Sequence, residues 1–333
     1  MKRRISLTLS RILWTALLAV AMVGAACSTN AAQPQIEFEQ SPGAVAITID
    51  EESFATYVYL DKTITRPYFA HVKAPGGIQV TRNHPPVQGK DLPDHATFHP
   101  GVWMSFGDIN GSDYWRLAAP VKFERFLVEP RAEGGRGSFA IRFNYPDQRH
   151  PDEIICSEDF RCEIRPVGAG RLILWDSTFS SDKAFTFGDQ EEMGLGFRVA
   201  TPIRAERESE IGLLPGNGEI VSSEGARNED EIWGKTADWC DYRGELQGQR
   251  VGIAIFSHPE NFRPSWFHAR NYGMIVANAF GRNAFGKGEK SSVTVEPGEK
   301  FRLRYGVFIH AGTKDQDPHI SKAYRDYVKL SSK

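Results

Sequence analysis

The chain has 333 residues, with 40 lysine and arginine side chains against 42 aspartate and glutamate side chains. No lysine- or arginine-rich run stands out within this near balance, which argues against nucleic acid as a partner. About 300 residues can bury a sizeable core, either as one large β domain or as two smaller domains.

The first 27 residues are expected to be a targeting segment. Four positive charges precede an apolar run of about 15 residues: Lys2, Arg3, Arg4 and Arg11, followed by residues 12–26. Such a run is too short to span a bilayer but has the length of a secretory signal. Cys27 stands where a bacterial lipobox has its lipidated cysteine, although Gly24 replaces the usual leucine. We expect an exported protein, either periplasmic or anchored to the outer membrane through a lipid on Cys27; ordinary cleavage near Ala25 or Ala32 is the alternative.

Residues 28–35 are expected to form a short tether, and from Ile36 the pattern is typical of many short strands. Segments rich in β-branched and aromatic residues, with turn residues between them, are 44–49, 54–60, 68–72, 77–81, 121–129, 138–145, 160–165, 171–179, 183–188, 195–199, 239–242, 249–257, 274–279, 291–295 and 301–309. Residues 203–231 are polar and glycine-rich, and only residues 318–330 have a helical pattern. The sequence therefore predicts an all-β fold: one large antiparallel β-sandwich over residues 36–333 with a short C-terminal helix.

Three further cysteines follow Cys27. Cys156 and Cys162 lie close together in the segment CSEDFRC. Because an exported protein meets an oxidising compartment, we expect a disulfide between them, stabilising by roughly 2 kcal/mol. Cys240 would then remain as a small buried hydrophobic residue. The sequence holds no CxxC pair, so a cysteine zinc site is not supported.

Residues 94–115, DHATFHPGVWMSFGDINGSDYW, combine histidines, carboxylates and tryptophans with glycine and proline. This composition is typical of a loop that lines a site rather than of a core strand. We assign His99 and Asp108 to proton transfer, and His95, Asn110 and Trp115 to substrate binding. The alternative is a long surface loop with incidental polar residues.

A second stretch, residues 256–285, has the same character. His268 and Arg270 are two positions apart, so in a strand their side chains would share one face. A histidine and an arginine on one face suit an anionic or oxygen-rich ligand. We assign His268 to proton transfer, and Arg270, Tyr272 and Asn278 to substrate binding.

Two shorter segments complete the candidate site. In DQEEMG, residues 189–194, a partly buried Glu191 or Glu192 would act as a general acid or base, and we prefer Glu192. Arg82, just before the first stretch, would add a cationic wall that binds substrate oxygens. Acidic residues in turns are usually only solvated, which is the alternative for this segment.

A metal site has one candidate in the sequence. Asp94, His95 and His99 form a DHxxxH cluster, whose histidines would share a face of a helix. Pro100 follows at once and makes a stable helix unfavourable. We therefore expect no required cofactor, with a bound divalent cation as the alternative. A phosphate-binding loop, a dinucleotide fingerprint and a serine nucleophile elbow are missing from the sequence.

Two long blocks resemble a bacterial secreted family labelled "methane oxygenase PmoA-like". The first is RPYFAHVKAPGGIQVTRNHPP followed by DHATFHPGVWMSFGDINGSDYW, where members have sequences close to DHPHHRGLWFGHGDVNG. The second is WCDYRG…VGIAIFSHPENFRPSWFHARNYGMIVANAFG, and the intervening EIVSSEG is also similar. The resemblance covers Thr65 to His310. It implies a fold like that of galactose mutarotase and a carbohydrate role. Methane oxidation is not expected, because a membrane methane monooxygenase subunit has several membrane helices.

The resemblance also carries individual positions. By motif, the matching residues are His95, His99, Asp108, Asn110, His268, Arg270 and Asn278. The chain departs from the family beside His99, where Phe98 and Pro100 replace a second consecutive histidine and an arginine.

Two functions fit these observations. The first is a secreted carbohydrate-active enzyme that acts on a glycoside or modified sugar through histidine and carboxylate acid–base chemistry, by hydrolysis, elimination or epimerisation. The second is a non-catalytic surface lipoprotein that binds glycans. The several histidine and arginine residues of the two stretches favour the enzyme, because a glycan binder needs mainly aromatic and amide side chains.

Overall fold

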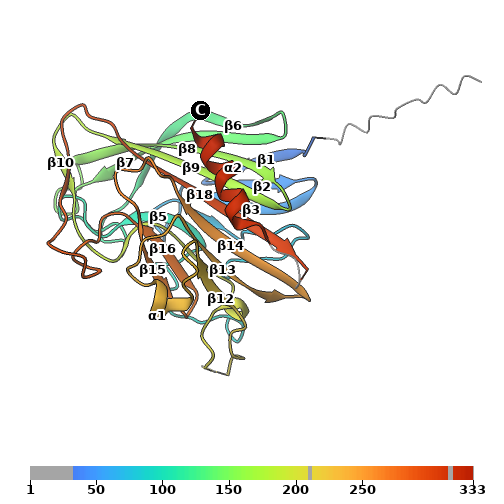
Figure 1. Ribbon diagram of the computed structural model, residues 1–333. Helices are drawn as coiled ribbons and strands as arrows, with labels where there is room; N and C mark the ends of the chain where they lie inside the picture. The colour runs from blue at the N-terminus through green and yellow to red at the C-terminus, as the bar shows by residue number, and fades with distance from the viewer. Residues whose placement is uncertain (1–32, 209–211, 314–317, 333) are drawn as a thin grey trace, which may run out of the picture. The chain divides into compact units, whose positions relative to one another are not determined.

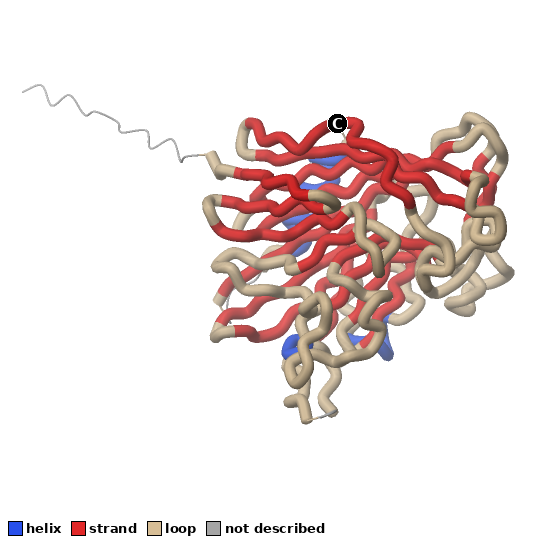
Figure 2. The backbone as a smooth tube through the Cα atoms, turned by 180° about the vertical axis from the view of Figure 1, so that it is seen from behind, coloured by secondary structure: helices blue, strands red, loops and turns tan. Residues whose placement is uncertain are grey.

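The computed structural model describes residues 33–208, 212–313 and 318–332. Alternating hydrophobic residues fold these segments into stacked antiparallel sheets, with few helical segments among the strands (Figures 1 and 2). In β2 (Ala44–Ile49), for example, Val45, Ile47 and Ile49 are buried and the residues between them are half-buried. This period of two is what places one side of each strand in the core.

The first sheet has eight strands, each antiparallel to its neighbours. Their order is β1 (Ile36–Ser41), β2, β3 (Glu52–Val58), β4 (Tyr68–Ala70), β5 (Val102–Phe106), β11 (Met193–Arg198), β16 (Met274–Asn278) and β15 (Trp266–Arg270). Its last four strands come from parts of the chain far apart in sequence, so they bring residues near 100, 195 and 270 together.

The second sheet also has eight antiparallel strands. Their order is β12 (Glu219–Ser222), β13 (Trp239–Leu246), β14 (Gln249–Ser257), β18 (Phe301–Gly312), β9 (Gly170–Ser180), β8 (Ile154–Val167), β7 (Arg136–Pro146) and β6 (Lys122–Glu133). A separate two-stranded antiparallel sheet pairs β10 (Phe185–Phe187) with β17 (Val293–Val295). The short helices are η1 (Thr201–Ile203) and α1 (Asn228–Ile232).

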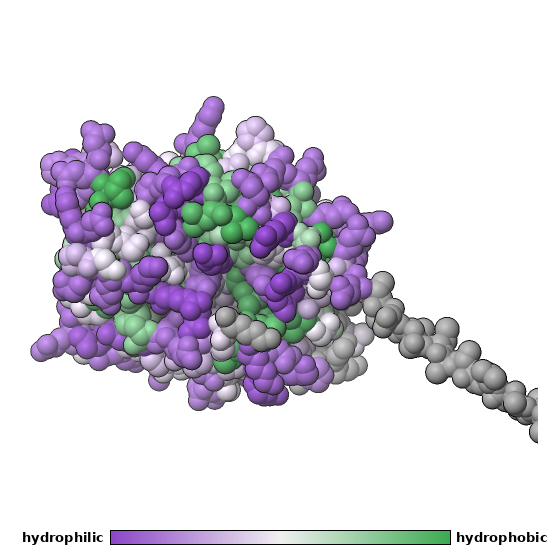
Figure 3. Space-filling model, turned by 90° about the horizontal axis from the view of Figure 1, so that it is seen from above, coloured by the Kyte–Doolittle hydropathy of each residue, from purple (hydrophilic) through white to green (hydrophobic). Residues whose placement is uncertain are grey.

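Helix α2 (Ile320–Ser331) covers the outer face of the second sheet (Figure 1). Its buried Ile320, Ala323 and Tyr327 pack with Phe256 and Phe308 of the sheet in a cluster of their own. Seen from above, hydrophilic side chains cover most of the surface and separate smaller hydrophobic areas (Figure 3). The helix therefore shields the apolar strip that Phe256 and Phe308 form on this face of the second sheet.

The structure confirms the expected all-β sandwich and its C-terminal helix. Three local expectations were wrong. Strand β5 lies inside the 94–115 stretch, residues 203–231 contain β12 and α1 as well as loops, and residues 77–81 form only isolated bridges. Among the described residues, none of the helices is long and apolar enough to cross a membrane. The expected targeting segment and Cys27 lie outside the described residues.

The expected disulfide between Cys156 and Cys162 is not formed. Both cysteines are buried free thiols in the same strand, β8. A strand rises about 3.3 Å per residue, so six positions separate their Cα atoms by roughly 20 Å. A disulfide needs Cα atoms within about 7 Å. Sequence proximity was misleading here because the intervening residues are extended rather than looped.

A thiol assay on a chain that begins at Ser28 will test this correction. In denaturant without reductant, we expect three reactive thiols, from Cys156, Cys162 and Cys240. In the native protein we expect very slow reaction, because all three are buried and burial raises their pKa well above the usual thiol value. Finding a single thiol in denaturant would restore the disulfide.

One carboxyl group lies in the core between the two sheets. Glu158 on β8 is 3% exposed and accepts hydrogen bonds from Tyr145 Oη at 2.6 Å and from Ser177 Oγ. Ser177 in turn accepts from Trp175 Nε1 at 3.0 Å. Burial raises the pKa of Glu158 to about 7, because the anion loses its hydration and nearby Asp159 adds repulsion, while the two hydroxyl donors only partly compensate.

This raised pKa predicts a specific pH dependence of stability. The folded state binds the proton of Glu158 more tightly than the unfolded chain, so its contribution is full below about pH 4.5 and is lost as the pH rises through about 7. Relative to Glu158→Gln, the wild type should lose roughly 3 kcal/mol of unfolding free energy between pH 4.5 and pH 8. Urea denaturation of both proteins across this range measures the difference. Equal pH slopes for the two proteins would contradict the assignment.

Candidate functional site

The two polar stretches meet on the outer face of the first sheet. On β15, Phe267 and Ala269 join the main core, so His268 and Arg270 point to the opposite side. Strand pairing aligns one row of residues across β5, β11, β16 and β15: Trp103, Gly196, Val276 and His268. The first stretch and His268 therefore share one surface, separated by three strand spacings or about 14 Å at the backbone.

A glycine in this row makes room for the tryptophan. A Cβ atom on Gly196 would lie 2.9 Å from Val276 Cγ2 and 3.5 Å from the ring of Trp103. The added atom would thus be too close to Val276 and in ordinary contact with Trp103, so a glycine lets these two side chains pack across β11. Trp103 is fully buried and packs edge-on against Trp115, with ring centroids 5.5 Å apart.

Arg82 fixes the loop between β4 and β5, which covers Trp103 and Trp115. Its guanidinium is 1% exposed and donates to four backbone carbonyls, at 2.7–3.3 Å, in the loop between β4 and β5: those of Leu92, Asp94, His95 and His99. Its terminal nitrogens Nη1 and Nη2 thus donate inside the protein, while its Nε is buried without a hydrogen-bond partner. The assignment of Arg82 to substrate binding was wrong, because a buried group with these partners positions the loop instead.

Arg198, at the end of β11, holds Asp94 from below. The two guanidinium nitrogens Nη1 and Nη2 donate to the two carboxylate oxygens of Asp94, each at 2.8 Å. Asp94 Oδ2 also lies 2.8 Å from Nδ1 of His95. Bidentate pairing fixes the plane of the carboxylate, so it also fixes the direction of the imidazole. The side chain of His95 is 47% exposed, so its ring reaches the surface.

The residues around Asp94, namely His95, Arg198 and Arg82, keep its carboxyl group ionised. Burial opposes ionisation, but the hydrogen bond from His95 and the charges of Arg198 and Arg82 outweigh it and lower the pKa of Asp94 well below its usual value. His99 is only 4% exposed and accepts from Arg198 at Nδ1, 3.5 Å away. Burial, and then the positive charge of Arg198, lower its pKa well below the usual value. His99 is therefore neutral at physiological pH.

His99 forms the middle of an aromatic stack. Its ring lies parallel to Trp103 at 5.0 Å on one side and to His95 at 4.7 Å on the other. The structure contradicts a proton-transferring role for His99, because the exposed histidine of the stack is His95. Trp115 is 2% exposed, so it cannot stack on a substrate as expected; it supports the stack from its edge.

The second group surrounds Glu191, just before β11. Its carboxylate oxygen Oε2 accepts from Arg270 Nη2 at 3.2 Å and lies 3.4 Å from His268 Nε2. Arg270 also donates to Glu229 of α1 at 2.7 Å, and its guanidinium lies over the ring of Trp233. The side chains of Glu191, Arg270 and Glu229 are each about one third exposed, whereas His268 is 4% exposed. Burial, and then Arg270, lower the pKa of His268 to about 3.

The preferred carboxylate, Glu192, was the wrong member of its pair. It lies 2.8 Å from Arg116, which also pairs with Asp113 at 3.0 Å. Glu192 therefore belongs to an ion-pair group between two loops, and Glu191 is the carboxylate that meets the histidine. Sequence alone could not separate the two, because both precede the first residue of β11.

Asn278 is a structural residue rather than a substrate ligand. It is fully buried, and its amide nitrogen donates to the carbonyls of Gln190 and Glu191 at 2.7 and 3.0 Å. Its oxygen accepts from the backbone of Phe280 and Gly281. It thus fixes the loop that carries Glu191.

Asp108 and Asn110 lie in a different place from the histidines. Asp108 Oδ1 accepts from the backbone of Gly111 at 2.8 Å, and Asn110 exchanges hydrogen bonds with the backbone of Thr186. Both residues line a cavity of about 370 Å³ whose lining includes Lys290 but neither histidine. The structure contradicts a shared acid–base site between Asp108 and His99 or His268.

Tyr272 lies between the group around Asp94 and the group around Glu191, and it contacts the group around Asp94. Its ring lies parallel to His95 at 5.9 Å, and the guanidinium of Arg198 lies 4.3 Å from its centroid. Its pKa is raised to about 12 by burial, with Arg198 and Arg270 lowering it and Asp94 and Glu229 raising it. Charged residues of both groups thus act on Tyr272, and its assignment to substrate binding stays a prediction.

The residues do not suit a metal ion. No group of three histidine, cysteine or carboxylate side chains in the described parts of the chain has the geometry of a metal site. The rings of His95 and His99 stack instead of converging, and both oxygens of Asp94 face Arg198. Buried arginines repel a cation, so the divalent-cation alternative does not fit this cluster.

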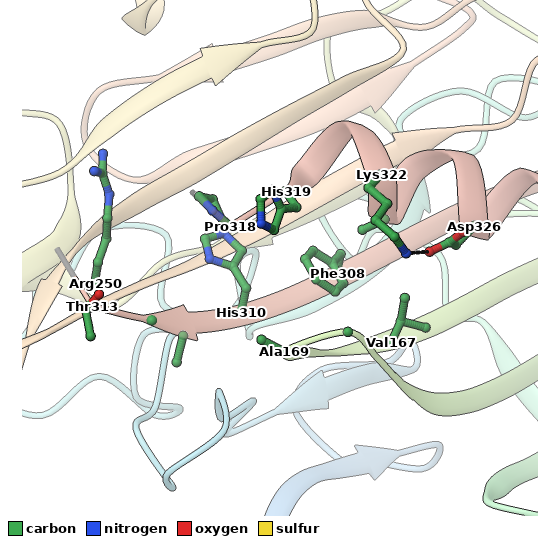
Figure 4. A pocket seen from close by; sticks show the side chains of 14 residues that line it. Val167, Ala169, Arg250, Phe308, His310, Thr313, Pro318, His319, Lys322 and Asp326 are labelled. Atoms are coloured by element: carbon green, nitrogen blue, oxygen red, sulfur yellow. Dashed lines mark hydrogen bonds and ion pairs between the residues drawn. The ribbon is translucent and has the colours of Figure 1, made fainter. Parts of the chain in front are cut away.

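Another cavity, of about 200 Å³, lies under the start of α2 on the second sheet (Figure 4). Its charged groups are paired within the protein: Lys322 with Asp326 at 2.6 Å, and His310 with the buried Asp241 at 2.9 Å. These pairs tie the helix and the strands together. The cavity lies on the second sheet, whereas the loops with His95 and Glu191 lead into β5 and β11 of the first sheet.

Sequence reasoning did not identify Arg198 as a site residue, and it named Glu191 only as the less preferred of two carboxylates. Asp94 was considered only as a metal ligand. Arg198 ends a predicted strand in which Leu195 and Phe197 face the core. That alternation was a usable signal, because it places an arginine on the outer face. Its pairing with Asp94, 104 positions away, was not predictable without the sheet order.

Comparisons with known proteins place the chain only coarsely. A family model described as "Family of unknown function (DUF6807)" matches residues 44–324. The sequence resemblance noted above falls inside these residues, but its label is not that of the matching model. A search of curated proteins gives no significant match.

Several solved structures are similar to the chain. The GH36 α-galactosidase AgaB from Geobacillus stearothermophilus has 10% identity and a TM-score of 0.44, over 84% of this chain and 41% of that one. The α-galactosidase AgaA from the same organism, in complex with stachyose, has 11% identity and a TM-score of 0.36, over 84% and 40%. A galactose mutarotase related enzyme from Lactobacillus acidophilus has 11% identity and a TM-score of 0.32, over 85% and 100%. The chain thus spans about two fifths of either α-galactosidase.

The role of Arg82 can be measured as stability. Arg82→Lys keeps the charge but cannot reach four carbonyls, so some of them lose a partner in a buried place. We expect the free energy of unfolding to fall by roughly 2–4 kcal/mol. The matched control is Arg125→Lys, whose exposed side chain pairs only with neighbouring Glu124 and should change stability by less than about 0.5 kcal/mol. Urea denaturation that gives equal effects would contradict the assignment.

Proposed function

The chain belongs to the DUF6807 family of unknown function, and we propose from its own site that it is an exported enzyme acting on a sugar-like substrate by acid–base chemistry. The chemistry is carried by His95, with Asp94 and Arg198 as the residues that orient it. Activity, substrate and export are all part of this proposal.

The observation that carries the proposal is the chain of contacts from Arg198 through Asp94 to His95. Asp94 accepts the proton of His95 Nδ1 at 2.8 Å, which leaves Nε2 as the nitrogen that exchanges a proton with a substrate. A base oriented by a carboxylate, itself held in place, is the arrangement that general acid–base catalysis requires. The exposed ring of His95 gives a substrate access to Nε2.

The surroundings suit a ligand rich in hydroxyl groups. Beyond Tyr272, the partly exposed side chains of Glu191, Arg270 and Glu229 offer donors and acceptors within one group. Hydroxyl groups can donate to the carboxylates and accept from the guanidinium. The ring of Tyr272, parallel to His95, offers an apolar edge beside them.

The sugar class rests on this chemistry and on the resemblance described above. The similar solved structures include enzymes named for galactosides and galactose, and one holds stachyose, but these names belong to those proteins. Hydrolysis, elimination and epimerisation all need proton transfer of the kind proposed for His95.

A non-catalytic glycan-binding lipoprotein is the competing function. Such a module would offer exposed aromatic rings as a platform. Here Trp103 and Trp115 are buried beneath the loop, so the two tryptophans of the first stretch do not form one. Binding without turnover is the result that would favour this function.

The test is turnover of plain and 3-keto glycosides, followed by NMR of the products. We expect His95→Asn to lower kcat/KM by at least about 100-fold, because the proton-exchanging nitrogen is lost. Asp94→Asn should also lower it, through loss of orientation. His150→Asn is the matched control, because His150 lies exposed in the turn between β7 and β8. Binding of the sugars without any change in them, or full activity of His95→Asn, would contradict the proposed function.

A further inference from the structure

We propose that Glu191 is a second proton-carrying group of this site, and that His268 beneath it holds that proton in place. This inference deepens the proposed function and rests on it for its catalytic part. The proton sharing itself is a property of the folded protein, so it can be tested whether or not a substrate is known.

The argument begins with the tautomer of His268. Its Nδ1 lies 3.2 Å from the backbone carbonyl oxygen of Glu191, which can only accept a hydrogen bond. Nδ1 must therefore carry a proton in this contact. In a neutral imidazole the other nitrogen, Nε2, then has a lone pair and can only accept.

A lone pair at Nε2 faces the carboxyl group of Glu191. Nε2 is buried and has no hydrogen-bond partner in the structure, and the nearest oxygen, Oε2 of Glu191, lies 3.4 Å away. If Glu191 were ionised, a lone pair of Oε2 would face the lone pair of the buried Nε2 with no proton between them. A proton on Oε2 removes this repulsion, because a hydroxyl donates to Nε2 and still accepts from Arg270 Nη2 at 3.2 Å.

The proton could instead reside on His268 as an imidazolium, but the surroundings oppose that charge. His268 is 4% exposed, and Arg270 lies two positions away on the same face of β15. Burial and Arg270 lower its pKa to about 3. A neutral His268 therefore leaves the shared proton on Glu191.

The charged groups around Glu191 act in both directions. Burial raises its pKa above the usual value, Arg270 lowers it, and neighbouring Glu192 raises it. Arg270 also pairs with Glu229 of α1, and Arg116 pairs with Glu192, so each positive charge is shared with a second carboxylate. The net result of these groups is a carboxyl group that keeps its proton to higher pH than an ordinary glutamate.

A proton donor, Glu191, then lies on one side of Tyr272 and a proton acceptor, His95, on the other. Glu191 gives its proton to a substrate oxygen, while Nε2 of His95 takes one proton from the substrate, so the proton count of the substrate does not change. Glu191 is left as a carboxylate that faces Arg270, and His95 is left as an imidazolium that faces Asp94. Each charge formed thus has an opposite charge already in place, and exchange with water restores both groups.

The first arm of the experiment is infrared spectroscopy of the full protein between pH 5 and pH 9, which detects protonated carboxyl groups. Most carboxyl groups are ionised in this range. We expect a carboxylic acid band in the wild type that Glu191→Gln removes and that Glu192→Gln, the matched neighbour, retains. The band of Glu158, whose pKa is also raised among the described carboxyl groups, should remain in both variants. A spectrum of Glu191→Gln identical to that of the wild type would overturn the proposal.

The second arm tests His268 as a positioning residue. Nitrogen NMR of the imidazole should show a neutral ring protonated at Nδ1; a ring protonated at Nε2, or an imidazolium, would overturn the proposal. His268→Asn should move the loss of the infrared band to lower pH, because the acceptor is removed. An unchanged titration of the band would show that His268 does not hold the proton.

The third arm applies once turnover is measured. Glu191→Gln should lower kcat/KM by about 100-fold or more and remove the loss of activity at alkaline pH. If the spectroscopic arms succeed and no sugar is turned over, the proposed function fails while the proton pair stands. If turnover exists and Glu191→Gln keeps the full pH profile, the proton-donating role fails while the role of His95 stands.

Discussion

Two buried guanidinium groups determine the arrangement of this site. Arg82 and Arg198 are each 1% exposed, and a charge taken out of water must find compensating groups inside the protein. Arg82 is compensated mainly by backbone carbonyls and Arg198 by the carboxylate of Asp94. The loop between β4 and β5 therefore cannot take another path without exposing or orphaning a charge. Its fixed path is what presents His95 at the surface and buries His99 beneath it.

On the outer face of the first sheet, the surroundings shift the pKa values of two carboxyl groups in opposite directions. Near the arginines, the hydrogen bond from His95 and the positive charges outweigh burial and lower the pKa of Asp94, whereas burial and then Arg198 lower the pKa of His99. Near Glu191, burial dominates, and the pKa of the carboxyl group rises instead. Groups whose pKa values are pushed apart by their surroundings are typical of sites that both accept and donate protons. The proposed proton donor and acceptor depend on both kinds of surroundings lying on one surface. A lowered or a raised carboxyl pKa alone also occurs in structural ion pairs.

The fold was predictable from the sequence, and the site only in part. Alternation in segments such as Ala44–Ile49 reports which side of a strand is buried, so the all-β sandwich and its C-terminal helix followed from local pattern. The same reasoning put His268 and Arg270 on one face correctly. It failed for residues 102–106, a strand inside a stretch chosen for its polar residues. It also failed for Cys156 and Cys162, where nearness in sequence suggested a loop that the strand does not form.

What sequence could not supply was the partner of each polar residue. Asp94, Arg82 and Asn278 all have side chains suited to ligand binding, and only the folded structure shows that all three form their hydrogen bonds within the protein. Strand pairing brings Arg198 and Arg270 to positions two strands apart, on either side of Met274. At that spacing, about 10 Å, a tyrosine from the following turn can separate the two groups while remaining within reach of both. The register of β11, β16 and β15 thus sets the distance between the proposed proton acceptor and the proposed proton donor. A one-residue slip would turn Arg198 or Arg270 into the core and remove one of them.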